Sequence, residues 1–122
     1  MSEFGDKMMG KCMDFSIRIV NLYKYLVEEK KEYVLSKQLL RSGTSIGANL
    51  AEAQAAISKK DFVAKAYISL KEAIESMYWL ELLYKTDYLK KEEYESLRQD
   101  CNELKRMLTS IIKTITTQAE VK

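Results

Sequence analysis

The sequence contains no histidine, and this absence removes several kinds of chemistry at once. Histidine is the usual general base near neutral pH, and it completes the Ser–His and Cys–His arrangements that activate nucleophiles. It is also a ligand in most zinc sites, and di-iron helical bundles hold their metals through Glu-x-x-His pairs. We therefore expect a protein that is not an enzyme and that uses no metal or cofactor.

Proline is also absent, and there are only four glycines, two of them near the start of the chain. The Asn-Gly and Asp-Gly pairs that mark β-hairpin turns are missing. One close pair of glycines, Gly43 and Gly47, lacks the strand and the lysine of a phosphate-binding loop. This composition predicts an all-α protein, and 122 residues suffice for one domain with a substantial core.

Cysteine is scarce and long apolar runs are missing. Cys12 and Cys101 are far apart, and both fall in apolar helical stripes, which favours reduced core residues over a disulfide. The first residues, MSEFGDKMMGK, lack the apolar region of a secretory signal, and no run approaches the length of a membrane span. We expect a cytoplasmic protein with no membrane partner.

Apolar residues recur at spacings of three and four along most of the chain, which predicts helices at about 7–29, 34–57, 59–85 and 89–116. The residues before the first helix are expected to fray, and those after 116 to be disordered. Ser58 and Asp61 match a capping box at the start of the third helix. Short connections favour an antiparallel, up-down-up-down four-helix bundle that forms one domain, residues 1–122.

Each predicted helix has one stripe that is expected to face the core. In chain order the stripes are Cys12, Phe15, Ile19, Leu22 and Leu26; Leu39, Gly43, Ile46, Leu50, Ala53 and Ile57; Val63, Ala66, Tyr67, Leu70, Ala73, Ile74, Met77, Leu80 and Tyr84; and Tyr94, Leu97, Cys101, Leu104, Leu108, Ile111 and Ile115.

The second helix has small residues on its back as well as on its core side. Gly43 and Gly47 each cost roughly 1 kcal/mol relative to alanine, and close approach by a neighbouring helix is the expected compensation. The back of the third helix is too apolar for open water. We therefore predict a homo-oligomer whose interface includes Thr44, Ala48, Ala51, Ala55, Ile68, Trp79 and Leu82.

Polar residues of the second helix lie between its two small-residue faces. Ser42, Thr44 and Ser45 are expected to bond back to carbonyls or to fill space, since hydroxyls in packed helices do so more often than they act as nucleophiles. Two interpretations of Asn49 and Glu52 remain open: a buried pair that sets the register, or a half-exposed ridge.

The acidic residues on this ridge and on the third helix fit ion pairing better than cation binding. Glu52, Glu72 and Glu75 come from only two helices, which is weak evidence for a metal site. A pairing of Lys37 or Arg41 with Glu72 or Glu75 is one arrangement that the sequence suggests.

The net charge is only +2, but the charge is unevenly distributed. Residues 30–71 contain eight basic and three acidic residues, whereas residues 72–103 contain four basic and nine acidic ones. Complementary charge between packed helices or subunits explains this pattern, and a basic face for nucleic acid is the alternative. The candidate phosphate contacts are Lys37, Arg41, Lys59, Lys60 and Lys65. The eight tyrosines fall mostly in apolar stripes, so we do not expect them to stack on bases.

The run RSGTSIGAN at residues 41–49, followed by Glu52 and Ala53, resembles the signature helix of the bacterial four-helix-bundle family called 23S ribosomal RNA intervening-sequence proteins. The resemblance spans about residues 36–89, although many relatives carry Glu-Gly where this chain has Glu52-Ala53. Its polar cluster is Arg41, Ser45, Asn49, Glu52, Glu72 and Glu75. The matching segments that follow are Ser58–Phe62, Lys65, Lys71–Ala73, Glu75, Tyr78–Leu80 and Leu82-Leu83.

The resemblance implies a four-helix bundle that assembles into a ring-shaped homopentamer and has no catalytic residues. The family is also similar to the accessory bundle protein of diversity-generating retroelements, which partners a reverse transcriptase and nucleic acid. Two functions follow as hypotheses: an oligomer associated with RNA or DNA, or a scaffold for a protein client with no nucleic-acid role.

Overall fold

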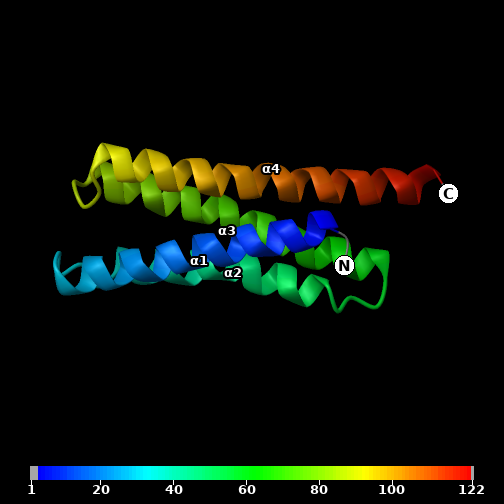
Figure 1. Ribbon diagram of the computed structural model, residues 1–122, viewed down its shortest axis with the longest axis horizontal. Helices are drawn as coiled ribbons and strands as arrows, with labels where there is room; N and C mark the ends of the chain where they lie inside the picture. The colour runs from blue at the N-terminus through cyan, green and yellow to red at the C-terminus, as the bar shows by residue number, and fades with distance from the viewer. Residues whose placement is uncertain (1–2, 122) are drawn as a thin grey trace.

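The computed structural model describes residues 3–121, which form four helices joined by short connections. They are α1 (Glu3–Glu28), α2 (Leu35–Ala53), α3 (Lys59–Lys85) and α4 (Lys91–Val121). Consecutive helices run antiparallel, so the start of α1 and the end of α4 lie at the same end of the bundle (Figure 1). Over the described residues each helix packs on its neighbours in sequence, α4 also packs on α1, and the diagonal pairs do not meet. The predicted all-α, up-down-up-down bundle is confirmed.

The predicted helix ends were less accurate than the fold. α1 begins at Glu3 rather than near residue 7, and α4 continues to Val121, where a disordered tail was expected. Met1, Ser2 and Lys122 lie outside the described residues. α2 ends at Ala53, four residues earlier than predicted.

The early end of α2 follows from the start of α3. The Ser58 side chain accepts a hydrogen bond from the Asp61 backbone N–H at 3.0 Å, and the Asp61 carboxylate accepts one from the Ile57 N–H at 3.3 Å. This confirms the capping role of Ser58, although the Asp61 carboxylate binds the Ile57 N–H and not the Ser58 N–H of a full capping box. The same bonds place Ile57 in the connection instead of in α2. Ile57 is 94% exposed, so its assignment to the core stripe was wrong.

α2 begins with a cap that the periodicity did not reveal. The Glu32 carboxylate accepts hydrogen bonds from the backbone N–H groups of Val34, Leu35 and Ser36 at 3.1, 3.0 and 2.6 Å. The Ser36 hydroxyl donates to the Glu32 carbonyl at 2.8 Å. Burial opposes ionisation of Glu32, but these donors outweigh it and lower its pKa. The side chain thus satisfies the N–H groups that the first turn leaves free.

The core contains the predicted stripes of three helices. The stripe of α1 is fully buried, that of α2 is buried up to Ala53, and that of α4 is buried from Leu97 to Leu108 with half-buried ends. Cys12 and Cys101 are free and buried, as predicted, and burial raises the pKa of their thiols to about 11 and about 12.

The core side of α3 differs from the prediction. Tyr67 and Ile74 were expected inside, but they are 53% and 50% exposed. The correction has a physical reason, since small residues let α3 approach α2 more closely than bulky ones do. The residues that face inward recur at spacings of three and four and are Ala66, Ser69, Ala73, Ser76, Leu80 and Leu83.

The hydroxyl groups of the two inward serines of α3 form hydrogen bonds with α2. The Ser69 hydroxyl donates to the Ile46 carbonyl at 2.6 Å, and the Ser76 hydroxyl lies 2.9 Å from the Ser42 hydroxyl. All three hydroxyl residues are fully buried. Because each hydroxyl has a partner, the close α2–α3 contact carries no penalty for unpaired polar groups.

α1 approaches α2 from the other side at the two glycines. A Cβ added at Gly43 would lie 2.9 Å from Ile19 Cγ1, and one at Gly47 would lie 3.1 Å from Cys12 Cβ. A Cβ at Gly43 would force a shift, and one at Gly47 would require Cys12 to move by a few tenths of an ångström, so the observed spacing favours glycine at both positions. The expected compensation for helical glycine is therefore found between α1 and α2.

Candidate interaction surfaces

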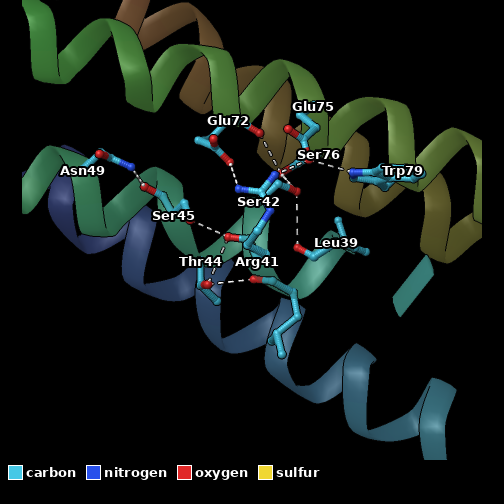
Figure 2. A network of polar contacts seen from close by, with 11 residues as sticks. Leu39, Arg41, Ser42, Thr44, Ser45, Asn49, Glu72, Glu75, Ser76 and Trp79 are labelled. Atoms are coloured by element: carbon cyan, nitrogen blue, oxygen red, sulfur yellow. Dashed lines mark hydrogen bonds and ion pairs between the residues drawn. The ribbon is translucent and has the colours of Figure 1, made fainter. Parts of the chain in front are cut away.

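A charged cluster joins the outer edges of α2 and α3. Figure 2 shows Arg41 of α2 between two glutamates of α3, with Trp79 beside them. Arg41 is 3.0 Å from Glu72, and its other terminal nitrogen binds Glu75. The Trp79 indole N–H donates to the same Glu75 carboxylate at 3.0 Å. The suggested pairing of Arg41 with these glutamates is found within one chain, whereas Lys37 is exposed and is not part of it.

The cluster stabilises the charged forms of its members. The Trp79 hydrogen bond, followed by the bond and charge of Arg41, lowers the pKa of Glu75 despite partial burial. The hydrogen bond that Arg41 donates to Glu75 is the main cause of the raised pKa of Arg41. The charges are partly solvated, with 49% of the Arg41 side chain exposed, so the cluster orients α2 and α3 more than it stabilises them.

The only tryptophan of the chain reports on this cluster. Protonation of Glu75 weakens its bond to the Trp79 indole, so the fluorescence of Trp79 should change as the pH falls. Because the pKa of Glu75 is lowered, we expect a midpoint below the ordinary value of 4.5. The stabilisation from Glu75 is present above its unfolded pKa and is lost as the pH falls through the folded one.

Two variants make this titration specific. Glu75→Gln should remove the transition while the amide oxygen still accepts from Trp79. Glu81→Gln changes an exposed glutamate of the same helix, which lies near Lys85, and should leave the transition in place. A midpoint at or above 4.5 in the unchanged protein would show that the lowered pKa is wrong.

The hydroxyls of α2 bond along their own helix, as predicted. Thr44 donates to the Leu40 carbonyl at 2.7 Å, and Ser45 donates to the Arg41 carbonyl. Asn49 is half-buried and donates to the Ser45 carbonyl at 2.8 Å, while Glu52 is exposed. Of the two interpretations left open for Asn49 and Glu52, this geometry fits the half-exposed ridge.

The three glutamates considered as cation ligands do not meet. Glu72 and Glu75 bind Arg41, whereas Glu52 lies 3.7 Å from Lys65. Over the residues that are described, no group of three or more Cys, Asp or Glu side chains is arranged to hold a metal ion. No helix in that part of the chain is both long and apolar enough to cross a bilayer.

The five candidate phosphate contacts do not form one patch. Arg41 and Lys65 are engaged with glutamates of the same chain. Lys37 lies near the start of α2 and Lys60 near the start of α3, at opposite ends of the bundle. The length of α2 separates these ends by about 25 Å at 1.5 Å per residue. Lys59 lies beside Lys60, and these two and Lys37 are exposed.

One apolar face covers the outer side of the α1–α2 pair. Ala48, Ala51 and Ala55 of the predicted interface are exposed in the single chain, and Thr44 is half-buried. On α1, Met13 and Ile17 are 59% and 51% exposed, and Val20 continues their stripe. Ser16, which approaches Gly47, lies three residues from Met13 and four from Val20, so the two stripes adjoin. We call Met13, Ile17, Val20, Thr44, Ala48 and Ala51 the first face.

A second apolar face lies on the outer side of the α3–α4 pair. Tyr67 and Leu70 line an open hollow of about 330 Å³, and α4 contributes Thr109, Ile112, Lys113, Thr116 and Thr117 to its lining. Ile74, one turn beyond Leu70, extends this face. In a square bundle the α1–α2 and α3–α4 pairs are opposite sides, so the two faces point away from each other. We call Tyr67, Leu70, Ile74, Thr109, Ile112 and Thr116 the second face.

The other predicted interface residues border the charged cluster. Ile68 is exposed, and Trp79 and Leu82 are half-buried, on the side of α3 that continues toward Glu75. They therefore lie on a different side of the bundle from the second face. The helical periodicity did not show that Met13 and Ile17 are exposed, or that Tyr67 and Ile74 point outward. The available signal in the sequence was that α1 and α3 each carry apolar residues outside the stripe that faces the core.

The fold and these surfaces define an antiparallel four-helix bundle with tightly packed small residues, a charged α2–α3 edge and two exposed apolar faces. The sequence profile of the 23S rRNA-intervening sequence protein family matches residues 6–110. The chain belongs to this family, which confirms the resemblance. No curated protein matches the chain significantly.

A solved structure supports the same assignment. It is described as a protein with unknown function from the S23 ribosomal protein family of Bacteroides thetaiotaomicron. The two sequences are 55% identical and the folds superpose with a TM-score of 0.89, over 90% of this chain and 98% of the other. The two proteins therefore share the fold of the bundle.

Proposed function

We propose that the protein is a non-enzymatic homo-oligomer, a ring of five subunits, that associates with RNA or DNA in the cytoplasm. The observation that carries the assembly is the pair of apolar faces on opposite sides of one bundle. Two different faces that bind each other form a head-to-tail contact, and such contacts close into rings when the rotation between subunits allows. The first face presents Met13 and Ile17 as projecting side chains, and the second offers a hollow beside Tyr67.

Association with nucleic acid is supported by charge and by the family to which the chain belongs. Lys37 and Lys60 are exposed at opposite ends of each subunit. A ring would repeat these weak sites five times around a common axis, and repeated contacts bind far more tightly than single ones. The free buried thiols are consistent with the reducing cytoplasm.

Gel shifts with labelled RNA and DNA test the nucleic-acid part. We expect binding at about 50 mM salt that is largely lost at about 200 mM, because lysine contacts to phosphates release counterions. Lys37→Gln combined with Lys60→Gln should weaken binding and flatten its salt dependence. Arg41→Gln is the matched control, since Arg41 is engaged by Glu72 and Glu75 and should contribute little. The absence of a shift at either salt concentration would reject the nucleic-acid role.

A scaffold for a protein client is the second candidate, and one observation favours it. Arg41 and Lys65, two of the five basic candidates, are engaged with carboxylates of their own chain. This lowers the positive charge available to nucleic acid. A scaffold would show the same oligomer with no gel shift, and a specific protein would be recovered with it from a lysate.

A further inference from the structure

The end of the bundle opposite the chain termini carries a hollow that belongs to neither apolar face. Its volume is about 570 Å³, and three separate parts of the chain line it. Tyr25 comes from the last turn of α1, Lys30 from the α1–α2 connection, and Tyr84 and Tyr88 from the end of α3 and the turn after it. Lys90 and Lys91 complete its basic side, with Asp87 and Glu93 as its acidic groups. The volume is within the range of small-ligand sites.

The aromatic part of this hollow is held in place. The Tyr84 ring stacks on Tyr94 of α4, with centroids 4.5 Å apart and an interplanar angle of 4°. Tyr25 is 40% exposed, and Lys30 Nζ lies 5.9 Å from its ring centre. A flat ligand in this hollow would therefore contact aromatic rings and an ammonium group together. It could stack on the rings and make a cation–π contact with the ammonium group.

The backbone around the hollow is equally well fixed. After α3, the N–H of Asp87 donates to the Tyr84 carbonyl at 3.1 Å and that of Tyr88 to the Leu83 carbonyl at 2.9 Å. Asp87 adopts a positive φ of 70°, as the residue that ends such a turn does. Lys31 has a φ of 56° in the facing connection, where the Glu32 N–H donates to the Leu26 carbonyl at 2.9 Å. The site is thus formed by two closed turns rather than by long loops.

We infer that this hollow binds a nucleotide of a single-stranded nucleic acid, with the base against the tyrosines and the phosphate near Lys30 and Lys90. This inference rests on the proposed association with nucleic acid and names its site. Aromatic rings stack on any base, with about 1–3 kcal/mol lost per base on removal of the ring. Lys91 lies 3.9 Å from Glu95, so Lys30 and Lys90 are the lysines of the lining that would meet the adjoining phosphate. Paired bases are not free to enter, so the site selects unpaired strands.

Fluorescence anisotropy with a labelled, unstructured RNA of about 12 nucleotides tests the site, since this length covers a typical single-strand footprint. Tyr25→Leu combined with Tyr88→Leu should weaken binding about tenfold or more while the salt dependence stays the same. Lys30→Gln combined with Lys90→Gln should weaken binding and reduce the salt slope by about 0.7 for each phosphate that is no longer neutralised. Tyr78→Leu, at an exposed tyrosine of α3 away from the hollow, is the matched control and should bind normally. A duplex of the same length should compete poorly.

The outcomes separate this site from the broader function. If the unchanged protein binds no RNA, the proposed function and this site are both rejected. If it binds, and the tyrosine and lysine variants with normal circular dichroism bind as tightly as the Tyr78→Leu control, the site is wrong and the function stands. Equal competition by the duplex would also exclude base stacking at this end of the bundle.

Discussion

Replacing Gly43 with alanine is expected to destabilise the protein, although the same replacement at Gly10 is expected to stabilise it. Alanine gains about 1 kcal/mol of helix propensity at either position. At Gly43 the new Cβ would lie 2.9 and 3.0 Å from the two Cγ atoms of Ile19, whereas nothing lies within 4 Å at Gly10. Overpacking typically costs about 1–3 kcal/mol, so Gly43→Ala should lose about 1 kcal/mol net and Gly43→Val about 3. Urea unfolding measures both changes.

A double-mutant cycle identifies the cause. Ile19→Ala removes the two Cγ atoms that lie closest to the new Cβ and leaves Ile19 Cβ at 3.4 Å, at a cost of its own of about 2–5 kcal/mol. In that background Gly43→Ala should become neutral or stabilising, which is a strong non-additivity for two residues in contact. If Gly43→Ala stabilises the unmodified protein as much as Gly10→Ala does, then α1 does not pack as closely on α2 as the structure indicates.

Replacing Ile17 with glutamate is expected to break the oligomer without unfolding the subunit. Ile17 is half-exposed in the single chain, so glutamate there keeps its hydration in the free subunit. In a head-to-tail contact the same carboxylate would be buried among apolar groups, at a cost of several kcal/mol for each interface. A cost of about 3 kcal/mol raises the dissociation constant more than a hundredfold. Multi-angle light scattering should show the subunit mass.

The control for this variant places the same charge outside both faces. Gln38→Glu adds a carboxylate to an exposed position near the start of α2 and should leave the assembly intact. Tyr67→Glu, on the second face, should dissociate the oligomer as Ile17→Glu does. Dissociation by Gln38→Glu as well would point to general charge repulsion instead of the first face.

The bundle was predictable because its strongest signals are regular. The α1 and α4 stripes, from Cys12 to Leu26 and from Leu97 to Leu108, are buried as their spacing indicates. The Ser58 cap could be predicted from residue type and position. The close helix contact at Gly43 could be predicted from the cost of glycine inside a helix. The Arg41 cluster was foreseen only as one of several pairings, because charge alone does not choose between Lys37 and Arg41.

The orientation of α3 was not predictable from hydrophobicity. Tyr67 and Ile74 are more apolar than Ser69 and Ser76, yet the serines lie inside because the α2–α3 spacing admits only small side chains at these positions. That spacing is a property of two helices together, and it shows in one sequence only as a repeat of small residues.

The hollow proposed to bind a nucleotide could not be predicted from the sequence, for a different reason. It is built from Tyr25, Tyr84 and Tyr88 on separate segments, which come together only when the two turns meet at one end of the bundle. The periodicity of each helix assigned tyrosines to stripes and carried no information about the bundle ends.

The mass of the unmodified protein in solution tests the proposed assembly most directly. Native mass spectrometry at micromolar subunit concentration should show a particle of roughly 70 kDa, five times the 14.2 kDa of one chain. A mass that fits a ring of another size would change the proposed number of subunits but would still support the contact between the two faces. A mass of 14.2 kDa across the micromolar range would contradict the proposed assembly, because both apolar faces of the protein would then be exposed to water in solution.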